Sequence, residues 1–268
     1  MMEMYGAKVF PSPSNQTEFG RKMLAQNPNH PGSLGIAISE AIEVAVGNVG
    51  KTAYSLGSVF NHVILHQTII GQEVMMQFEQ IDQEPDVMIG CAGGGSNFSG
   101  FTYPALGKQL REGGNKRFIA VGSSEIPKFT KYAANHSIYQ YDFGETSKVT
   151  PMLKMLSLGS DFIPPPIYAG GLRYHGYSPT LSLLLDEGAI EGVDYPQGDA
   201  FQAAKIFSET EGLIPAPETS HAIAATIDEA KKCKKTGEKK ILAFNYSGHG
   251  LLDLEAYADV ILKEKATA

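Results

Sequence analysis

The chain has 268 residues and a formal net charge of −7, with 29 acidic against 22 basic side chains. This length allows one large domain or two modest ones around a real hydrophobic core, and the acidic balance disfavours nucleic acid and anionic membranes as partners. Its two cysteines match no metal or redox spacing, and no run of about 18 apolar residues is present, so we expect a cytoplasmic protein.

Apolar residues at helical spacing dominate the first 80 positions. The chain opens on a strand-like piece at 6–10 with no earlier element to pair with, so we expect a sequence that is truncated at its N-terminus. Helices are predicted over 15–26, 34–46 and 60–80, where apolar side chains recur about every four residues.

A turn with three consecutive glycines follows the first clear strand, which is predicted over 86–89. The glycines at 93–95 leave backbone N–H groups uncovered by any Cβ, Ser96 and Asn97 add polar donors, and a helix is predicted over 98–111. Such a turn at a helix N-terminus suits a phosphate dianion. The turn matches neither a Walker A loop nor a dinucleotide-binding motif. The alternative to phosphate binding is that the glycines only make a tight strand–helix turn and bind no ligand.

Strands and helices alternate through much of the remaining chain. This order predicts an α/β fold with a mainly parallel twisted sheet and helices on both faces. Residues 125–166 show little periodicity and are predicted to be loop-rich. The other predicted elements, in chain order, are a strand over 117–121, a helix from a Ser178 cap to residue 187, a helix from an Asp199 cap to residue 211, a helix over 220–235, a strand over 241–246 and a helix over 252–263.

Three polar loops are expected at the carboxyl ends of the strands, where ligands gather in open α/β sheets. They are residues 93–97, 213–221 and 244–250. Glu218 stands at the start of a helix in the second loop, and Ser247 follows the last strand in the third. A favourable charge at a helix N-terminus and ordinary turn chemistry are the alternative explanations for these two side chains.

Taken in order, these loops resemble the tryptophan synthase β chain family. The matching stretches are Gly-Gly-Gly-Ser-Asn at 93–97, Glu-Gly-Leu-Ile-Pro-Ala-Pro-Glu-Thr-Ser-His-Ala at 211–222 and Asn-Tyr-Ser-Gly-His-Gly at 245–250. Phe-Pro-Ser-Pro-Ser at 10–14 and Gly-Leu-Arg-Tyr-His-Gly at 171–176 resemble the second, divergent group of these β chains. The resemblance runs over essentially the whole chain.

This resemblance implies the fold type II architecture of pyridoxal-phosphate (PLP) dependent enzymes, truncated at its N-terminus. Residues 1–85 would be the remainder of a mobile N-terminal domain, and residues 86–268 would form the PLP-binding α/β domain. The implied reaction is the β-replacement of L-serine with indole to give L-tryptophan. The resemblance also implies a homodimer and a tryptophan synthase α chain as partner, with neither nucleic acid nor membrane bound.

The resemblance also assigns roles to individual residues. The cofactor phosphate would be held by Gly93, Gly94, Gly95, Ser96 and Asn97. Ser247 would hydrogen-bond the pyridine nitrogen, Glu218 would lie beside the ring, and Asp161 would engage the substrate hydroxyl. A monovalent cation, Na⁺ or K⁺, would be held by main-chain carbonyls of Gly93, Phe162 and Pro164.

The lysine that holds the cofactor in this family has no counterpart in the chain. In the family it follows a histidine, whereas no His-Lys pair occurs here and none of the 18 lysines has a matching context. We therefore expect the chain to be inactive by itself. A non-catalytic PLP-binding or interaction fragment and another fold type II β-replacement enzyme are the alternatives, and the joint presence of Glu218, Ser247 and Asp161 favours a catalytic origin.

Overall fold

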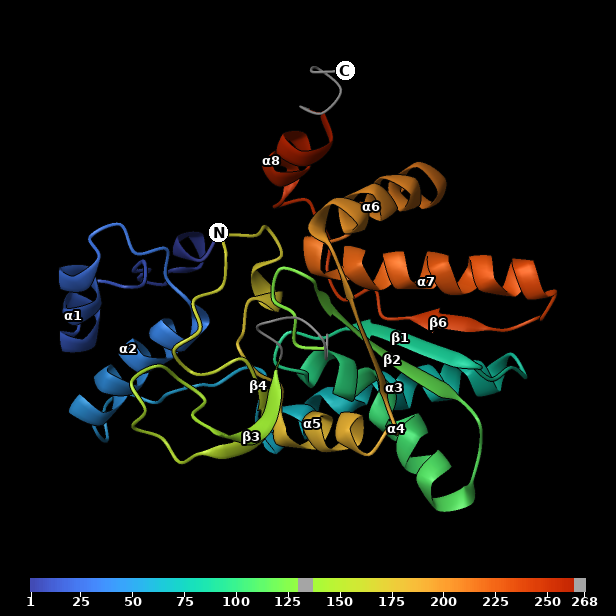
Figure 1. The fold of residues 1–268 in the computed structure, drawn as a ribbon, viewed down its shortest axis with the longest axis horizontal. Helices are drawn as coiled ribbons and strands as arrows, with labels where there is room; N and C mark the ends of the chain where they lie inside the picture. The colour runs from blue at the N-terminus through green and yellow to red at the C-terminus, as the bar shows by residue number, and fades with distance from the viewer. Residues whose placement is uncertain (130–136, 263–268) are drawn as a thin grey trace.

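A four-stranded parallel sheet forms the centre of the molecule (Figure 1). The computed structural model describes residues 1–129 and 137–262. The strand order is β5 (Glu191–Tyr195), β2 (Arg117–Ser123), β1 (Val87–Cys91) and β6 (Leu242–Phe244), and every pairing is parallel. The carboxyl ends of all four strands therefore meet at one edge of the sheet.

Helices cover both faces of this sheet. α6 (Gln197–Glu211) and α7 (Pro217–Thr236) lie on one face, while α3 (Asn61–Gln80), α4 (Ser96–Glu112) and α5 (Pro179–Asp186) lie on the other (Figure 1). α8 (Leu254–Tyr257) packs against α6 through a separate small core. The predicted α/β arrangement with a mainly parallel sheet is confirmed.

The core follows from the alternation of side chains along the two central strands. Met88 and Phe118 point to the α4 face, where they pack with Phe98. Val87 and Ile89 point to the opposite face and pack against α7. β1 is buried along its whole length, as expected of a central parallel strand with helices on both sides.

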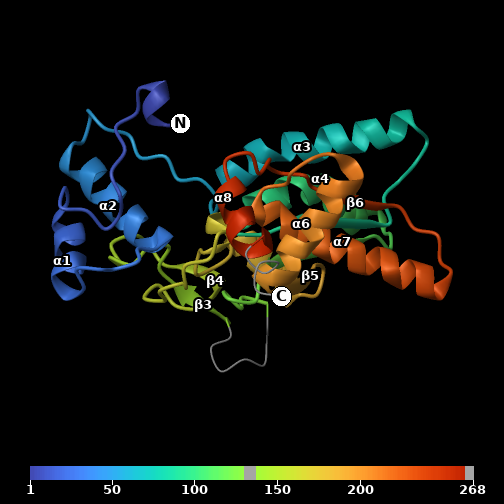
Figure 2. The same cartoon turned by 90° about the horizontal axis from the view of Figure 1, so that it is seen from above.

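The N-terminal segments lie to one side of these layers (Figures 1 and 2). They are a 3₁₀ turn, η1 (Glu3–Tyr5), followed by α1 (Glu18–Gln26) and α2 (Leu34–Gly47). Glu40 on α2 accepts hydrogen bonds from the Ser14 backbone N–H and the Thr17 hydroxyl, which ties α2 to the start of α1. Burial raises the pKa of Glu40, but a hydrogen bond from the Ser12 hydroxyl and those from Thr17 and Ser14 outweigh burial and lower it overall.

α3 belongs with the sheet layers by its contacts, because it crosses α4 at very short range. A Cβ on Gly71 would lie 2.5 Å from the Phe101 carbonyl oxygen, and one on Gly100 would lie 2.6 Å from the Gln67 carbonyl oxygen. Glycine on both helices therefore allows their backbones to touch. The division of the chain at residue 85 stays a prediction. Within the described residues, no helix has both the length and the apolar character required to cross a membrane.

Several predicted elements are wrong. Residues 7–10 form no strand. The stretch predicted to be loop-rich contains an antiparallel pair, β3 (Ile138–Asp142) with β4 (Leu153–Ser157), and a 3₁₀ turn, η2 (Gly170–Leu172), follows it. β5 was not predicted at all, because its sequence Glu-Gly-Val-Asp-Tyr has little strand propensity and pairs with β2 alone.

Several helix boundaries also differ from the prediction. α1 begins at Glu18 and not at residue 15, and α7 begins at Pro217 and not at residue 220. α6 begins at Gln197, so Asp199 lies in its first turn and not at its cap. There the carboxylate still complements the helix dipole. The closing helix is shorter than predicted, since α8 ends at Tyr257 and a π-helical turn follows over Ala258–Leu262. Residue 263, the predicted end of that helix, lies outside the described residues.

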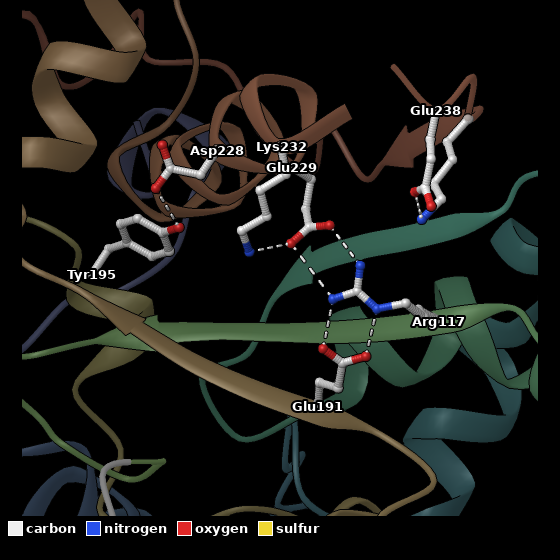
Figure 3. Close-up of polar contacts among 8 residues, drawn as sticks. Arg117, Glu191, Tyr195, Asp228, Glu229, Lys232 and Glu238 are labelled. Carbon is white, nitrogen blue, oxygen red and sulfur yellow. Dashed lines mark hydrogen bonds and ion pairs between the residues drawn. The ribbon is translucent and has the colours of Figure 1, made fainter. Parts of the chain in front are cut away.

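An ion-pair network joins α7 to the sheet at the edge opposite the carboxyl ends of the strands (Figure 3). Arg117, the first residue of β2, binds both carboxylate oxygens of Glu191 at 2.7 Å and Glu229 of α7 at 2.6 Å. Lys232 binds the same Glu229 carboxylate at 2.7 Å. Burial raises the pKa of Glu229, but hydrogen bonds from Arg117 and Lys232 outweigh burial and hold it below its ordinary value.

Replacing Arg117 with methionine is expected to lower the free energy of unfolding by about 1–2 kcal/mol. The loss stays modest because the arginine side chain is 35 % exposed, but the variant leaves Glu229, 7 % exposed, with Lys232 alone. Urea unfolding followed by circular dichroism measures the change. The free energy of unfolding of Arg117→Lys is expected to lie between those of the unaltered chain and Arg117→Met. Lysine keeps the positive charge but cannot bind both carboxylate oxygens of Glu191 as arginine does. The control Glu238→Gln, in an exposed pair, is expected to shift stability by less than about 0.5 kcal/mol, and an equal loss in the control would contradict this role.

Candidate active site

The three polar loops meet at the carboxyl edge of the sheet. The segment before α7 pairs with the loop after β6, since the Ala216 N–H donates to the Gly248 carbonyl at 2.9 Å and the Gly250 N–H donates to the Ile214 carbonyl at 2.7 Å. The side chain of Asn97 accepts from the side chain of Asn245 at 3.0 Å, which joins the glycine loop to the same pair. The prediction that these loops lie together is confirmed.

A cavity of about 350 Å³ lies between these loops. Its wall combines all five residues of the Gly93–Asn97 loop with the carboxylate of the second loop and the hydroxyl of the third. The remaining lining residues come from α2, the segment before α3, β1, η2 and the start of α7 with the residue before it, and they are Leu34, Ser58, Cys91, Gly171, Leu172, Ala216 and Thr219. The structure thus places Glu218 and Ser247 at one cavity with the glycine loop.

Each glycine of the loop is required by a different contact. A Cβ on Gly93 would lie 1.9 Å from the Gly171 carbonyl oxygen, and one on Gly94 would lie 2.3 Å from the Ser58 hydroxyl oxygen. Gly95 has a φ of +116°, in the left-handed region that favours glycine, and it turns the chain into α4. The glycines therefore let three backbone segments approach one another closely.

The loop turns its carbonyl groups toward the protein. The Gly94 carbonyl accepts from the Ser178 N–H at 2.7 Å, and the Gly95 carbonyl accepts from the Ser99 N–H at 2.9 Å. Within the described residues, the backbone N–H groups of Gly94, Gly95 and Asn97 have no hydrogen-bond partner. Unpartnered N–H groups at the N-terminus of α4, beside a cavity, form a favourable environment for an anion.

The Asn97 side chain has a structural function in this arrangement. Its Nδ2 donates to the Cys91 carbonyl at 3.1 Å, while its Oδ1 accepts from Asn245. The side chain is thus committed to joining β1 and the last loop, and only its backbone N–H remains for a ligand. The prediction that Asn97 contributes to phosphate binding therefore stays a prediction about its backbone N–H.

Ser247 and Glu218 have different surroundings at the cavity. The Ser247 hydroxyl lies 3.2 Å from the Thr219 hydroxyl and 3.5 Å from the Cys91 thiol. Burial raises the pKa of Cys91 to about 11, so this thiol is protonated at neutral pH and is no nucleophile. The Glu218 Oε1 accepts from the Gly171 N–H at 2.7 Å, which anchors the carboxylate beside η2.

Asp161, Phe162 and Pro164 do not line this cavity. Asp161 is 72 % exposed and pairs with Lys148 at 2.5 Å. The Pro164 carbonyl accepts from the Arg173 guanidinium at 3.1 Å. The substrate contact predicted for Asp161 and the monovalent-cation site predicted for the main-chain carbonyls of Gly93, Phe162 and Pro164 stay predictions.

Sequence reasoning missed Lys128, which lies directly behind the glycine loop. Its Nζ donates to the Gly93 carbonyl at 2.6 Å and lies 4.2 Å from the centre of the Tyr177 ring. Burial lowers the pKa of Lys128 to about 7, and Asp194 acts in the opposite direction. A lysine soon after the end of a predicted parallel strand is a weak signal for such a position, because the strand ends next to the ligand edge.

Known proteins resemble this chain over nearly its whole length. The family model described as "Pyridoxal-phosphate dependent enzyme" matches residues 1–248. Tryptophan synthase beta chain 2 of Aeropyrum pernix is 54 % identical over 97 % of this chain, and that of Thermotoga maritima is 54 % identical over 96 %. The chain spans 57 % and 59 % of the lengths of these two relatives. The resemblance found in the sequence motifs is confirmed.

Solved structures show the same fold at low identity. A threonine deaminase from T.th. aligns with a TM-score of 0.51 at 16 % identity, covering 70 % of this chain and 56 % of that one. An L-serine ammonia-lyase from Rhizomucor miehei aligns with a TM-score of 0.53 at 17 % identity, covering 81 % and 63 %. These similarities concern the fold alone, and with the family match they confirm the predicted fold type II architecture.

Replacing Gly93 with alanine is expected to lower the free energy of unfolding by about 1–3 kcal/mol, because its Cβ would force the glycine loop away from Gly171. The matched control is Gly198→Ala on α6, where a Cβ would meet nothing within 4 Å. There alanine is expected to be neutral or to stabilise by up to about 1 kcal/mol. Thermal unfolding measures both variants, and equal stability of the two would contradict the close approach of the loops.

Proposed function

Because the chain belongs to the pyridoxal-phosphate dependent enzyme family, we propose that the cavity between its three loops binds pyridoxal 5′-phosphate. The observation that supports this proposal is the set of unpartnered N–H groups of Gly94, Gly95 and Asn97 beside the cavity, counted within the described residues. Backbone donors at a helix N-terminus favour a dianionic phosphate without any charged side chain. The donor set and the cavity therefore fit the phosphate group.

Ser247 would lie at the pyridine end of the cofactor. Its hydroxyl is a neutral donor, and the neighbouring Thr219 hydroxyl and Cys91 thiol carry no charge either. A neutral group hydrogen-bonded to the ring nitrogen leaves that nitrogen unprotonated, whereas a carboxylate would favour its protonation. Bound PLP supplies an electron sink for amino-acid substrates, and Ser247 would restrain the strength of that sink.

Glu218 would act on the incoming substrate. One carboxylate oxygen, Oε1, is held by the Gly171 N–H, which fixes the orientation of the group. The other oxygen, Oε2, has no hydrogen-bond partner within the described residues. It would accept a hydrogen bond or a proton from an N–H group on the nucleophile, so the carboxylate would both orient and activate that nucleophile.

We propose β-replacement of L-serine with indole, giving L-tryptophan, as the reaction that this site serves. The support is the relatives named tryptophan synthase beta chain, together with the position of Glu218 beside the glycine loop. The two substrates are small molecules, in keeping with the size of the cavity. In this proposal Asp161 must leave Lys148 before it can contact the serine hydroxyl.

The setting of the reaction is part of the same proposal. We infer a cytoplasmic location, a homodimer and, as a partner, a tryptophan synthase α chain. The competing proposals are a non-catalytic protein that binds PLP and a different fold type II enzyme. If the protein only bound PLP, the anchored Glu218 carboxylate would have no function. If it were a different fold type II enzyme, its preferred amino acid would differ from L-serine.

The 268-residue chain is expected to bind PLP at least about tenfold more tightly than pyridoxal, because charge-assisted hydrogen bonds to the phosphate account for the difference. Calorimetric titration measures both affinities, and sulfate is expected to compete with PLP. Gly93→Ala is expected to lose this preference, while the control Gly198→Ala keeps it. Equal affinities for PLP and pyridoxal in the unaltered chain would contradict the phosphate site.

The preferred amino acid is expected to be L-serine or L-tryptophan over L-threonine. Within the described residues no lysine lines the cavity, so we expect no tryptophan formation by the chain itself. A binding measurement therefore tests the preference. The absorbance spectrum of the PLP-loaded chain is recorded during titration with each amino acid. Half-maximal change at lower L-threonine concentration would contradict the proposed reaction and favour a deaminase. Absence of any change with all three would favour the non-catalytic alternative.

A further inference from the structure

Lys128 is buried to an extent that is rare for lysine. It is 2 % exposed and lies in the segment that follows β2. Lysine side chains reach water in most proteins, since removing an amine from solvent costs several kcal/mol unless it is well paired. The site described above assigns no role to this residue, so its burial requires an explanation.

The surrounding contacts hold the Lys128 backbone and side chain in one place. The Phe129 N–H donates to Asp194 Oδ2 at 3.0 Å, and the Ser137 hydroxyl donates to the Lys128 carbonyl. The Phe129 ring stacks on Tyr177 at 4.6 Å between centroids, and the Lys128 Nζ lies over that same Tyr177 ring. The amine is therefore directed by these contacts toward the Gly93 carbonyl.

The Gly93 carbonyl determines where the Gly94 N–H points. Both groups belong to one peptide bond, which is trans, so they point in opposite directions. The Lys128 Nζ, 2.6 Å from the carbonyl oxygen, holds that oxygen on the protein side. A rotation of this peptide would exchange a donor for an acceptor at the cavity, where a carbonyl oxygen would repel a phosphate.

The neighbouring peptides of the loop are held by backbone groups instead. The Gly94 carbonyl accepts from Ser178 and the Gly95 carbonyl accepts from Ser99, both through main-chain N–H groups. The peptide between Gly93 and Gly94 differs from these two, since its carbonyl accepts from a side chain. Glycine on both sides also gives this peptide a low barrier to reorientation.

We propose that Lys128 is a positioning residue for anion binding, because its amine holds the Gly93 carbonyl on the protein side, away from the cavity, and so presents the Gly94 N–H to the phosphate. This inference rests on the proposed phosphate site. An amine donates a hydrogen bond whether or not it is protonated, so the orientation of the peptide does not depend on the charge of Lys128.

The test compares Lys128→Met with the exposed control Lys231→Met, using PLP, sulfate and pyridoxal as probes. Lys128→Met is expected to weaken PLP and sulfate binding about tenfold, as expected for one lost donor to a charged group, and to leave pyridoxal binding unchanged. Its melting temperature is expected to be equal or higher, because an apolar side chain of similar shape replaces a buried amine. Lys231→Met is expected to bind all three probes as the unaltered chain does.

Rescue separates positioning from a purely structural role. Lys128→Ala with added n-propylammonium is expected to recover sulfate binding, because this ion supplies the deleted atoms and the donor. Tetramethylammonium, which has no N–H, is expected to have no effect. Lys128→Arg keeps a donor and is expected to retain affinity within about threefold.

The outcomes distinguish this inference from the proposed function. If the unaltered chain binds neither PLP nor sulfate, the phosphate site itself is wrong. If it binds both and Lys128→Met binds them equally well, the positioning role alone is overturned. A folded Lys128→Ala variant that n-propylammonium does not rescue would overturn it too, as would loss of folding in all three Lys128 variants.

Discussion

The site depends on one close contact, in which the glycine loop after β1 lies directly against the backbone of η2. No Cβ fits between Gly93 and the Gly171 carbonyl, so the two segments touch without an intervening side chain. This contact brings the Gly171 N–H to the Glu218 carboxylate. Gly95, two residues after Gly93, then turns the chain into α4 with a φ of +116°. The cavity, the Glu218 carboxylate and the N-terminus of α4 thus all lie beside this contact.

The two edges of the sheet are stabilised differently, and this difference explains where a ligand site can form. At the amino edge, Arg117 joins β2, β5 and α7 through charged side chains that satisfy one another. At the carboxyl edge, loops are joined by backbone hydrogen bonds and by the Asn97–Asn245 pair. N–H groups of the glycine loop are left without partners among the described residues, and a ligand or water can satisfy them.

The parts of the fold that follow from local sequence were predictable, and the parts that follow from tertiary contact were not. α2 and α3 show strong apolar periodicity, and β1 is a continuous apolar run, so the predicted and observed bounds agree closely. β5 carries charged residues and a glycine, as edge strands often do, and it exists because β2 offers a partner. The Lys128–Gly93 contact joins residues 35 apart through a segment without periodicity, so the only signal in the sequence is the weak one of a lysine that follows a strand.

Asn97 shows why the ligand-facing part of the Gly93–Asn97 loop can consist of glycines and needs no polar side chains. Its amide satisfies Cys91 and Asn245, and so it organises the protein instead of facing the ligand. The ligand-facing donors belong to the backbone, which has a fixed geometry and loses no side-chain entropy on binding. A backbone donor, however, points correctly only if its peptide cannot rotate. A loop made flexible by glycine therefore needs fixed groups behind it, and here those groups are Ser178, Ser99 and the buried amine of Lys128.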